Sequence, residues 1–218
     1  MSRIEEISVK SKENILKKLE NAYTEKDFQV THTIDPVEHI QNTSDALIQM
    51  KQKMSDNKFI VEEASADTLE KKINEIVAIY GYKKLLYPAN IPLDITQIQA
   101  NEKICFDKDI EELRHEVFNS DFSIVQARAG VSSHGVALVV SSKEQPRMLS
   151  LAPKLCIMLL KKENVVQSLS QALHLIKDEN EILPSNILFI AGPSRTADIE
   201  LITVFGVHGP QKVHIIIY

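Results

Sequence analysis

The chain has 218 residues, of which 44% are apolar and 25% charged, and its formal net charge at pH 7 is −5. This length and balance are typical of one globular α/β domain, alone or with an appendage. The negative charge argues against nucleic acid as a partner, since nucleic-acid binding usually requires a basic face. No apolar run approaches the length of a membrane span, and residues 1–7 lack the apolar core of a signal peptide. We therefore expect a cytoplasmic protein without a membrane span.

Residues 8–24 and 44–54 predict two helices, because apolar side chains recur at helical spacing in both segments. The connector between them is polar, and this part of the chain contains no convincing strand. The predicted apolar stripes consist of Ile15, Leu16, Leu19, Tyr23, Leu47, Met50 and Met54. We expect residues 1–57 to form a helical extension and residues 58–218 to form the main domain.

From residue 58 onward, short apolar runs alternate with segments of helical spacing. The predicted strands are 59–61, 85–87, 103–106, 121–127, 135–140, 154–160, 187–190 and 213–218. The predicted helices are 67–80, 109–117 and 164–176, with Gly81 and Asn164 as caps of the first and last. This alternation favours a mostly parallel sheet with helices on its faces. Strands 121–127 and 135–140 are close enough to form a hairpin, which predicts that the sheet is mixed.

The loop after strand 187–190 is the strongest candidate for a site, because ligands of α/β sheets bind beyond the carboxyl ends of strands. It combines glycine, proline, hydroxyl and charged residues between two predicted strands, and a short helix is expected to begin near Thr196. The candidate residues are Gly192, Pro193, Ser194, Arg195, Thr196, Asp198, Glu200, His208 and Gly209.

Each polar residue of this loop has a binding role and a structural role open to it. Ser194 and Thr196 can bind an anion, or they can cap the expected helix. Arg195 can clamp a carboxylate, or it can form a salt bridge to an acid of the same loop. His208 can act as an acid–base group, or it can lock the turn through a backbone carbonyl. The whole loop can also be a rigid corner that joins two strands.

Cys105 and Cys156 each lie in an apolar run, which predicts buried free thiols. Two thiolates cannot bind a four-ligand iron–sulfur cluster, and the 7 His residues show no metal-ligand spacing. The sequence also lacks a Walker loop, a dinucleotide-binding glycine motif and a convincing Ser-His-Asp order. We therefore expect no cofactor and no metal on this chain.

The carboxyl-terminal third of the chain resembles the lactate-utilisation protein C family, whose domain is called the LUD domain. The resemblance is carried by Leu183 to Ser185, Phe189 to Glu200, Gly206 to Pro210 and Val213 to Ile217, and more weakly by Arg147 to Leu151 and Gly135. It implies a three-layer α/β/α fold with a mostly parallel, mixed sheet, like that of ribose-phosphate isomerase and the coenzyme A transferases.

The resemblance also implies a function: a non-redox subunit of a complex that oxidises L-lactate to pyruvate and supports growth on lactate. Such a subunit acts in assembly, substrate binding or regulation. The implied partners are two subunits that carry iron–sulfur clusters, and a small carboxylate is the implied ligand.

One turn departs from the family pattern. A Glu-Thr-Gly-Thr-like turn is usual there, whereas this chain has Ser133-His134-Gly135-Val136. Its acidic and hydroxyl groups are replaced, so we expect Gly135, His134 and Arg147 to serve in binding or docking and assign no catalytic residue. The alternative is a stand-alone enzyme that acts on a small anion, such as a sugar phosphate or acyl-coenzyme A, through Arg147 and the loop residues Arg195 and His208.

Overall fold

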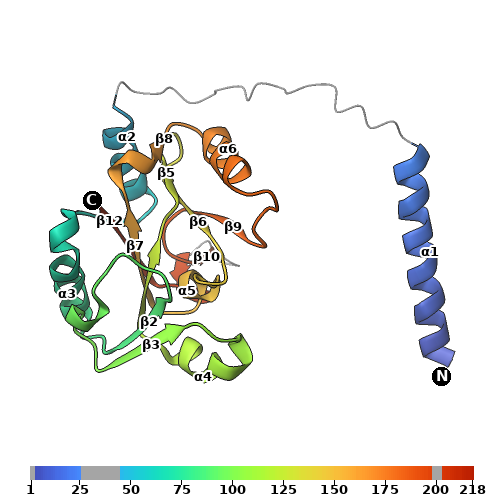
Figure 1. The fold of residues 1–218 in the computed structure, drawn as a ribbon, viewed down its shortest axis with the longest axis horizontal. Helices are drawn as coiled ribbons and strands as arrows, with labels where there is room; N and C mark the ends of the chain where they lie inside the picture. The colour runs from blue at the N-terminus through green and yellow to red at the C-terminus, as the bar shows by residue number, and fades with distance from the viewer. Residues whose placement is uncertain (1–2, 26–44, 198–202) are drawn as a thin grey trace. The chain divides into compact units, whose positions relative to one another are not determined.

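The computed structural model describes residues 3–25, 45–197 and 203–218. It divides into two units, Met1–Glu38 and His39–Tyr218. The first unit contains helix α1 (Arg3–Glu25), which the helical spacing predicts (Figure 1). The predicted connector at 31–42 lies outside the described residues. None of the helices in the described part of the chain is both long and apolar enough to cross a bilayer.

Helix α2 (Ala46–Asp56) belongs to the second unit, although we expected the boundary after residue 57. The helix begins where the Asp45 carboxylate accepts hydrogen bonds from the backbone N–H groups of Leu47 and Ile48 (2.9 and 3.0 Å). Met50 and Met54 are completely buried in the largest core cluster, as their helical spacing predicts. Burial of these side chains makes α2 an integral part of the α/β domain.

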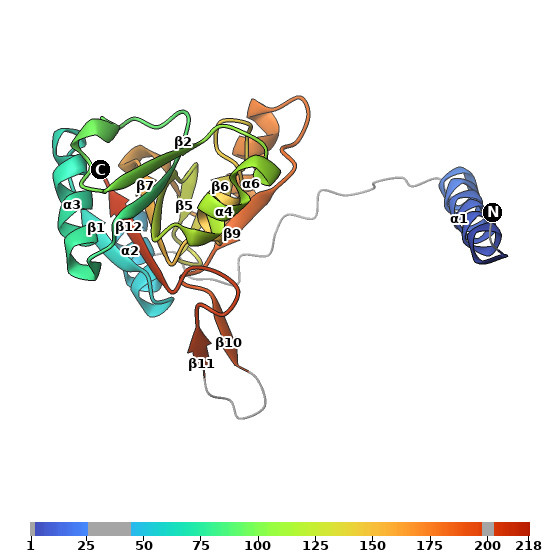
Figure 2. The same ribbon diagram turned by 90° about the horizontal axis from the view of Figure 1, so that it is seen from below.

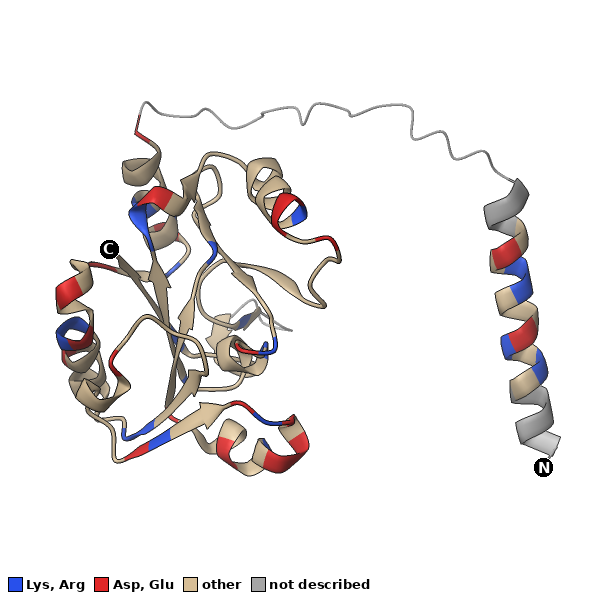
Figure 3. Ribbon diagram, in the orientation of Figure 1, with Lys and Arg blue, Asp and Glu red and all other residues tan. Residues whose placement is uncertain are grey.

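The centre of this domain is a six-stranded sheet in which every neighbouring pair is parallel. In spatial order the strands are β1 (Ile60–Glu63), β12 (Lys212–Ile217), β7 (Leu155–Leu160), β4 (Phe122–Gln126), β2 (Lys84–Pro88) and β3 (Glu102–Phe106). Strand β7 is entirely apolar and buried, because both of its faces are covered. Charged residues concentrate on helices and connections and are sparse on the central strands (Figure 3).

Alternate residues of the central strands enter two separate cores. On β7, Leu155, Ile157 and Leu159 pack with helix α3 (Leu69–Tyr80), whereas the intervening residues face α2. Short α5 (Met148–Leu151) and α4 (Ile110–Asn119) lie on the same side as α2. Gly81 ends α3 with φ 65°, as its position after the apolar stripe predicts. The α/β prediction, with helices on both faces of a mostly parallel sheet, is confirmed.

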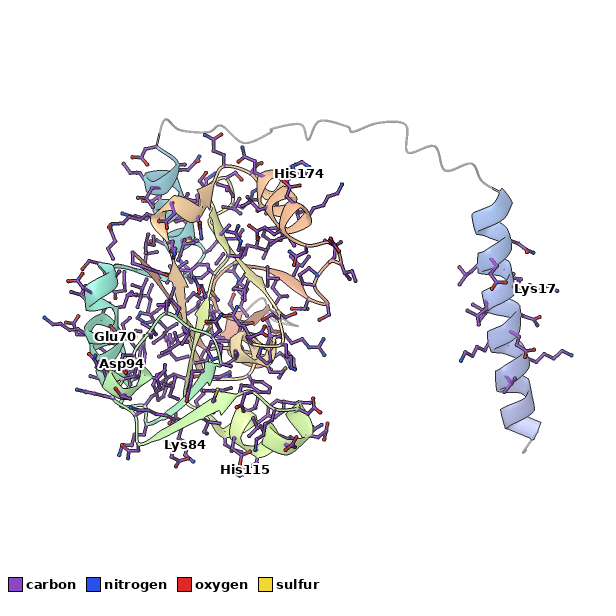
Figure 4. All side chains as sticks on the ribbon, viewed as in Figure 1. Lys17, Glu70, Lys84, Asp94, His115 and His174 are labelled. Carbon is purple, nitrogen blue, oxygen red and sulfur yellow. The ribbon has the colours of Figure 1, made fainter. Side chains whose placement is uncertain are left out.

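The loop that follows β2 is tied back to the beginning of α3. This loop contains the 3₁₀ turn η2 (Ile95–Gln97), and two further turns of this kind are η1 (Ala66–Thr68) and η3 (Lys162–Asn164). The backbone N–H of Asp94 donates a 2.9 Å hydrogen bond to Glu70 of α3, and the two residues are labelled side by side in Figure 4. This contact holds the loop over the face of the sheet that α3 covers.

A second, four-stranded sheet accounts for the antiparallel pairing. Its order is β8 (Val165–Val166), β5 (Ala129–Val131), β6 (Val136–Val140) and β9 (Ile187–Ile190). The predicted hairpin of strands 121–127 and 135–140 is wrong, because β6 pairs instead with β5 and with β9. Helix α6 (Leu169–Glu179) covers the outer face of this sheet and is capped by Ser168, not by Asn164. The central sheet is thus wholly parallel, whereas the second sheet is mixed, because β5 pairs parallel with β8 and antiparallel with β6.

Candidate functional site

The predicted loop follows β9, which belongs to the second sheet, and so it does not lie at the carboxyl edge of the parallel sheet. It returns to the amino-terminal ends of β12 and β7, where the backbone N–H of Gln211 donates a 2.8 Å hydrogen bond to the Lys154 carbonyl. The rule that places ligands beyond the carboxyl ends of parallel strands therefore does not apply to it.

The expected helix near Thr196 is absent, and that prediction is wrong. Residues Arg195–Ala197 form strand β10, which pairs antiparallel with β11 (Thr203–Phe205). Thr196 lies opposite Val204 in this pairing, and β-branched residues of this kind favour strands. Ser194 and Thr196 therefore do not cap a helix. Asp198 and Glu200 lie outside the described residues.

Ser194 is the centre of a rigid corner. Its N–H donates to the Pro210 carbonyl at 2.9 Å, and its carbonyl accepts from the Gly206 N–H at 2.8 Å. A Cβ on Gly209 would lie 3.1 Å from the Ser194 Cβ, so the two backbones approach closely. These contacts give Ser194 and Gly209 a structural role in joining β9, the β10–β11 ribbon and β12.

Gly192 and Pro193 are buried, and Gly192 packs against the end of α2. Gly192 has φ 87°, and a Cβ at this position would overlap the Asn57 carbonyl oxygen. Both its conformation and its packing therefore require glycine. No ligand is needed to account for a glycine at position 192.

Arg195 and His208 are the exposed polar residues of this corner. The Arg195 guanidinium donates a long, 3.5 Å hydrogen bond to the Ala191 carbonyl. Among the described residues, no hydrogen bond or ion pair joins Arg195 to His208. Both side chains are thus exposed on the surface of the described part of this corner.

The turn that contains His134 and Gly135 also packs on the end of α2. The Asn57 Nδ2 donates to the His134 and Gly135 carbonyls at 2.9 and 3.0 Å. The Lys53 Nζ donates to the Ser133 carbonyl at 2.7 Å, and Gly135, with φ 62°, leaves no room for a Cβ beside Lys53. The structure thereby brings the Gly135 turn and the Gly192 corner to one place, the carboxyl end of α2.

Within this turn, Ser133 is buried and His134 is exposed. The Ser133 Oγ lies 2.7 Å from the His134 Nδ1, so the two side chains form a hydrogen-bonded pair. Asn57 and Lys53 were missed by sequence reasoning, because their contacts join residues about eighty positions apart and no local pattern marks them.

Arg147 lies elsewhere, at the beginning of α5. It is exposed and lines a cavity of about 640 Å³ between α4 and the connection from β6 to α5. The charged residues of this cavity are Lys108, Arg114, Lys143, Arg147, Asp107, Asp109 and Glu112, and its apolar residues include Phe106, Ile110 and Phe118. The lining of this cavity includes Arg147 but neither Arg195 nor His208.

A smaller cavity of about 270 Å³ lies where the parallel strands β2, β4 and β7 end. Its lining residues follow these strands and β6: Asn90, Gln126, Ala127, Arg128, Val140, Ser142, Glu144, Gln145 and Asn164. This is the edge at which ligands of α/β sheets usually bind. The rule that ligands bind beyond the carboxyl ends of parallel strands therefore indicates this cavity, and not the loop after β9, once the strand pairing is known.

Gln145 is the residue that organises this edge. Its Oε1 accepts from the Gln126 N–H at 2.8 Å, and its Nε2 donates to the Gln126 and Val140 carbonyls at 3.1 and 3.3 Å. It thereby joins the end of β4 to the end of β6. Arg128 forms a bidentate ion pair with Glu179 of α6, so its charge is already compensated.

The two thiols and the buried histidine are poor candidates for chemistry. Cys156 is fully buried, and burial raises the pKa of its thiol to about 12. His214 is 1% exposed on β12 and its Nε2 is 2.8 Å from the Tyr80 hydroxyl oxygen, which places it in the core. Burial lowers the pKa of His214 to about 4. In the part of the chain that the structure describes, no three metal-ligating side chains are placed to hold an ion.

Comparison with known proteins gives the family. The LUD domain model matches residues 4–218. Lactate utilization protein C of Halalkalibacterium halodurans is 31% identical over 160 residues, which are 70% of each chain. An uncharacterised protein of Neisseria meningitidis is 34% identical over 53% of this chain and 50% of its own, and YkgG of Escherichia coli is 43% identical over 43% and 42%. The chain thus matches about half the length of these last two relatives.

A solved structure has the same fold. The crystal structure of a DUF162 family protein from Deinococcus radiodurans superposes with a TM-score of 0.59 at 19% identity, over 79% of this chain and 95% of that one. The match of the LUD domain model to residues 4–218 establishes that the chain belongs to the LUD domain family.

Proposed function

We propose that this chain acts in lactate utilisation, as the subunit without a redox centre in a complex that oxidises L-lactate to pyruvate. The observation that carries the proposal is the similarity to lactate utilization protein C over 70% of both chains. The proposed partners are two subunits that hold iron–sulfur clusters. A small carboxylate is the proposed ligand.

The positions of the thiols support the assignment of the redox centres to partners. Cys105 is on β3 and Cys156 on β7, and strands β2 and β4 separate them. Three strand spacings amount to about 14 Å, which is too far for both thiols to bind one cluster. Burial also raises the pKa of both thiols, and this disfavours the thiolate form that binds iron.

The exposed corner around Arg195 and His208 is the proposed docking surface. The buried glycines beneath it hold the backbone in one conformation, while the two side chains project into solvent. A rigid base with exposed polar side chains suits recognition of a partner or a carboxylate.

Reconstitution from purified components tests this function. The chain alone should be colourless and inactive towards L-lactate, and mixing it with both partner subunits should restore lactate oxidation with an artificial electron acceptor. Arg195→Ala and His208→Ala should lower the activity of the mixture at unchanged melting temperature, whereas Lys71→Ala on the exposed surface of α3 should not. Normal growth on L-lactate after deletion of the gene would refute the proposal.

The cavity at Arg147 favours a second candidate function, an enzyme that acts on a small anion. Its volume of about 640 Å³ is within the usual range for small-molecule sites, and four cations line it: Lys108, Arg114, Lys143 and Arg147. Three acids line it as well, so it suits a ligand with one anionic group better than a polyanion.

A thermal-shift screen with small carboxylates and phosphorylated sugars separates the two candidates. A ligand at a hundred times its dissociation constant adds about 2.7 kcal/mol to the free energy of unfolding. Arg147→Ala should abolish the shift, and Lys71→Ala should preserve it. Absence of a shift with all compounds would exclude the enzyme candidate for these ligand classes.

A further inference from the structure

The β10–β11 ribbon projects from the rest of unit His39–Tyr218 (Figure 2). Within the described residues, each of its two strands pairs with the other and with no further strand. Isolated two-stranded ribbons are at best marginally stable in water. This one nevertheless exposes three apolar side chains, Val204, Phe205 and Val207, at 51%, 42% and 54%. A partner that covers the ribbon would stabilise its two strands and would also remove the apolar side chains from water.

The hydrogen bonds of the ribbon reveal which backbone groups face its free edge. The Gly206 N–H donates to the Ser194 carbonyl at 2.8 Å, and Phe205 lies opposite Arg195. Hydrogen-bonded and non-hydrogen-bonded pairs alternate along an antiparallel ladder. Val204 is therefore bonded to β10, whereas the N–H and C=O groups of Thr203 and Phe205 point to the open side of β11.

In its described residues, 203–207, this open side lacks the charged and proline residues that discourage strand pairing. Residues 203–207 read Thr-Val-Phe-Gly-Val, without a charge or a proline. Soluble proteins generally protect a free edge with lysine, proline or a bulge. A neutral edge of β-branched and aromatic residues is suited to accept another strand.

We propose that β11 pairs antiparallel with β11 of a second copy of this chain, about a two-fold axis at Val204. Thr203 of each copy then lies opposite Phe205 of the other, and their outward N–H and C=O groups form four hydrogen bonds. The two Val204 residues face each other in a non-hydrogen-bonded pair, with Cα atoms about 4.5 Å apart.

A second copy fits this edge because the edge is complementary to itself. The outward groups of Thr203 and Phe205 are placed symmetrically about Val204, so one strand satisfies the other in the same register. An interface of this kind is isologous, as in most homodimers. It also needs no complementary charge, and residues 203–207 offer none.

Disulfide trapping tests the register. In a Cys105→Ser background, Val204→Cys should give under mild oxidation a species of twice 24.6 kDa, because 4.5 Å is within the Cα separation that disulfides span. Thr203→Cys is the matched control. The two Thr203 residues are two positions out of register, more than 7 Å apart, and should cross-link at least about tenfold more slowly. Equal cross-linking of both variants would overturn the proposed register.

Molar mass in solution tests the dimer itself. Light scattering after size exclusion should give twice 24.6 kDa for the unmodified chain and 24.6 kDa for Val204→Lys, which places two like charges on the axis. Ile79→Lys, the same change at an exposed position on α3, should remain dimeric. A monomeric unmodified chain at all concentrations up to about 100 μM, or a dimeric Val204→Lys, would refute the proposal. Neither readout depends on lactate oxidation.

Discussion

The carbonyl oxygen of Asn57 occupies the space that a Cβ on Gly192 would require. This contact joins the carboxyl end of α2 to the corner after β9, and Asn57 uses its side-chain amide to hold the Gly135 turn at the same time. One residue thereby fixes the position of the Gly192 corner relative to the Gly135 turn.

Gly192→Ala should destabilise the domain by about 2–5 kcal/mol, since a left-handed alanine costs about 1–2 kcal/mol and overlap with a neighbour adds about 1–3. Gly81→Ala is the matched control, because Gly81 has φ 65° but no atom within 4 Å of the added Cβ. Gly81→Ala should lower the free energy of unfolding by about 1 kcal/mol, because only the cost of the left-handed conformation applies there. Urea unfolding of both variants measures the difference in their free energies of unfolding. Equal destabilisation of the two variants would show that the contact with Asn57 does not contribute to stability.

Asn57→Ala should lower the free energy of unfolding by about 1–3 kcal/mol, because two backbone carbonyls lose their donors in a partly buried position. Asn101→Ala, at an exposed asparagine, should change it by less than about 0.5 kcal/mol. Chemical denaturation is again the measurement. If both variants retain the stability of the unmodified chain, the hydrogen bonds from Asn57 to the Gly135 turn do not contribute to stability.

His214 should make stability depend on pH below neutrality. Its pKa is about 4 in the folded state against 6.5 when exposed, so the unfolded chain binds more protons between these values. The free energy of unfolding should therefore fall as pH is lowered through this window, by about 2 kcal/mol from pH 7 to 5 from this group alone. In His214→Phe that part of the slope should vanish, whatever the stability of the variant at pH 7. An unchanged slope would mean that the pKa of His214 is not lowered in the folded state, with Glu62, 3.9 Å from the His214 Nδ1, offsetting the effect of burial.

The two thiols should differ in their reaction with Ellman's reagent. Cys156 is fully buried with a pKa near 12 and should not react in the native protein, whereas partly buried Cys105 should react slowly. In denaturant both should react. Rapid native labelling of two thiols would show that the sheet opens at β7, and Cys105→Ser identifies which thiol is labelled.

The sequence predicted the elements well wherever the apolar pattern was long. The stripe of Leu69, Ile73 and Ile76 predicts α3, and Gly81 predicts its end, because both depend on residues close together in the chain. Strand β7 is recognisable for the same reason, since six consecutive apolar residues are unusual outside a buried strand.

Pairing and packing could not be derived in this way. The three residues after Arg128 form β5, and β6 pairs with this short strand in the second sheet. No local sequence pattern predicts this pairing. The helix expected near Thr196 failed because threonine, which suits a helix N-terminus, is β-branched and also suits a strand when a partner strand is present. The partner of β10, Thr203–Phe205, was not recognised as a strand.

For two of the glycines in the candidate site, the structure gives a packing reason that the sequence does not reveal. Gly192 and Gly135 are needed because α2 packs against them, and this contact depends on Asn57 and Lys53, far away in the sequence. Arg195 and His208 are exposed, and whether they bind a partner stays a prediction.

Strand β12 has a consequence for how the chain folds during synthesis. It lies inside the parallel sheet, between β1 and β7, and pairs residues 60–63 with 214–217. While the ribosome is still synthesising residues before 212, β1 has no neighbour and β7 has an open edge. The domain therefore cannot complete its fold progressively from the amino terminus, and its nascent chain must remain protected from aggregation until residue 217 has left the exit tunnel.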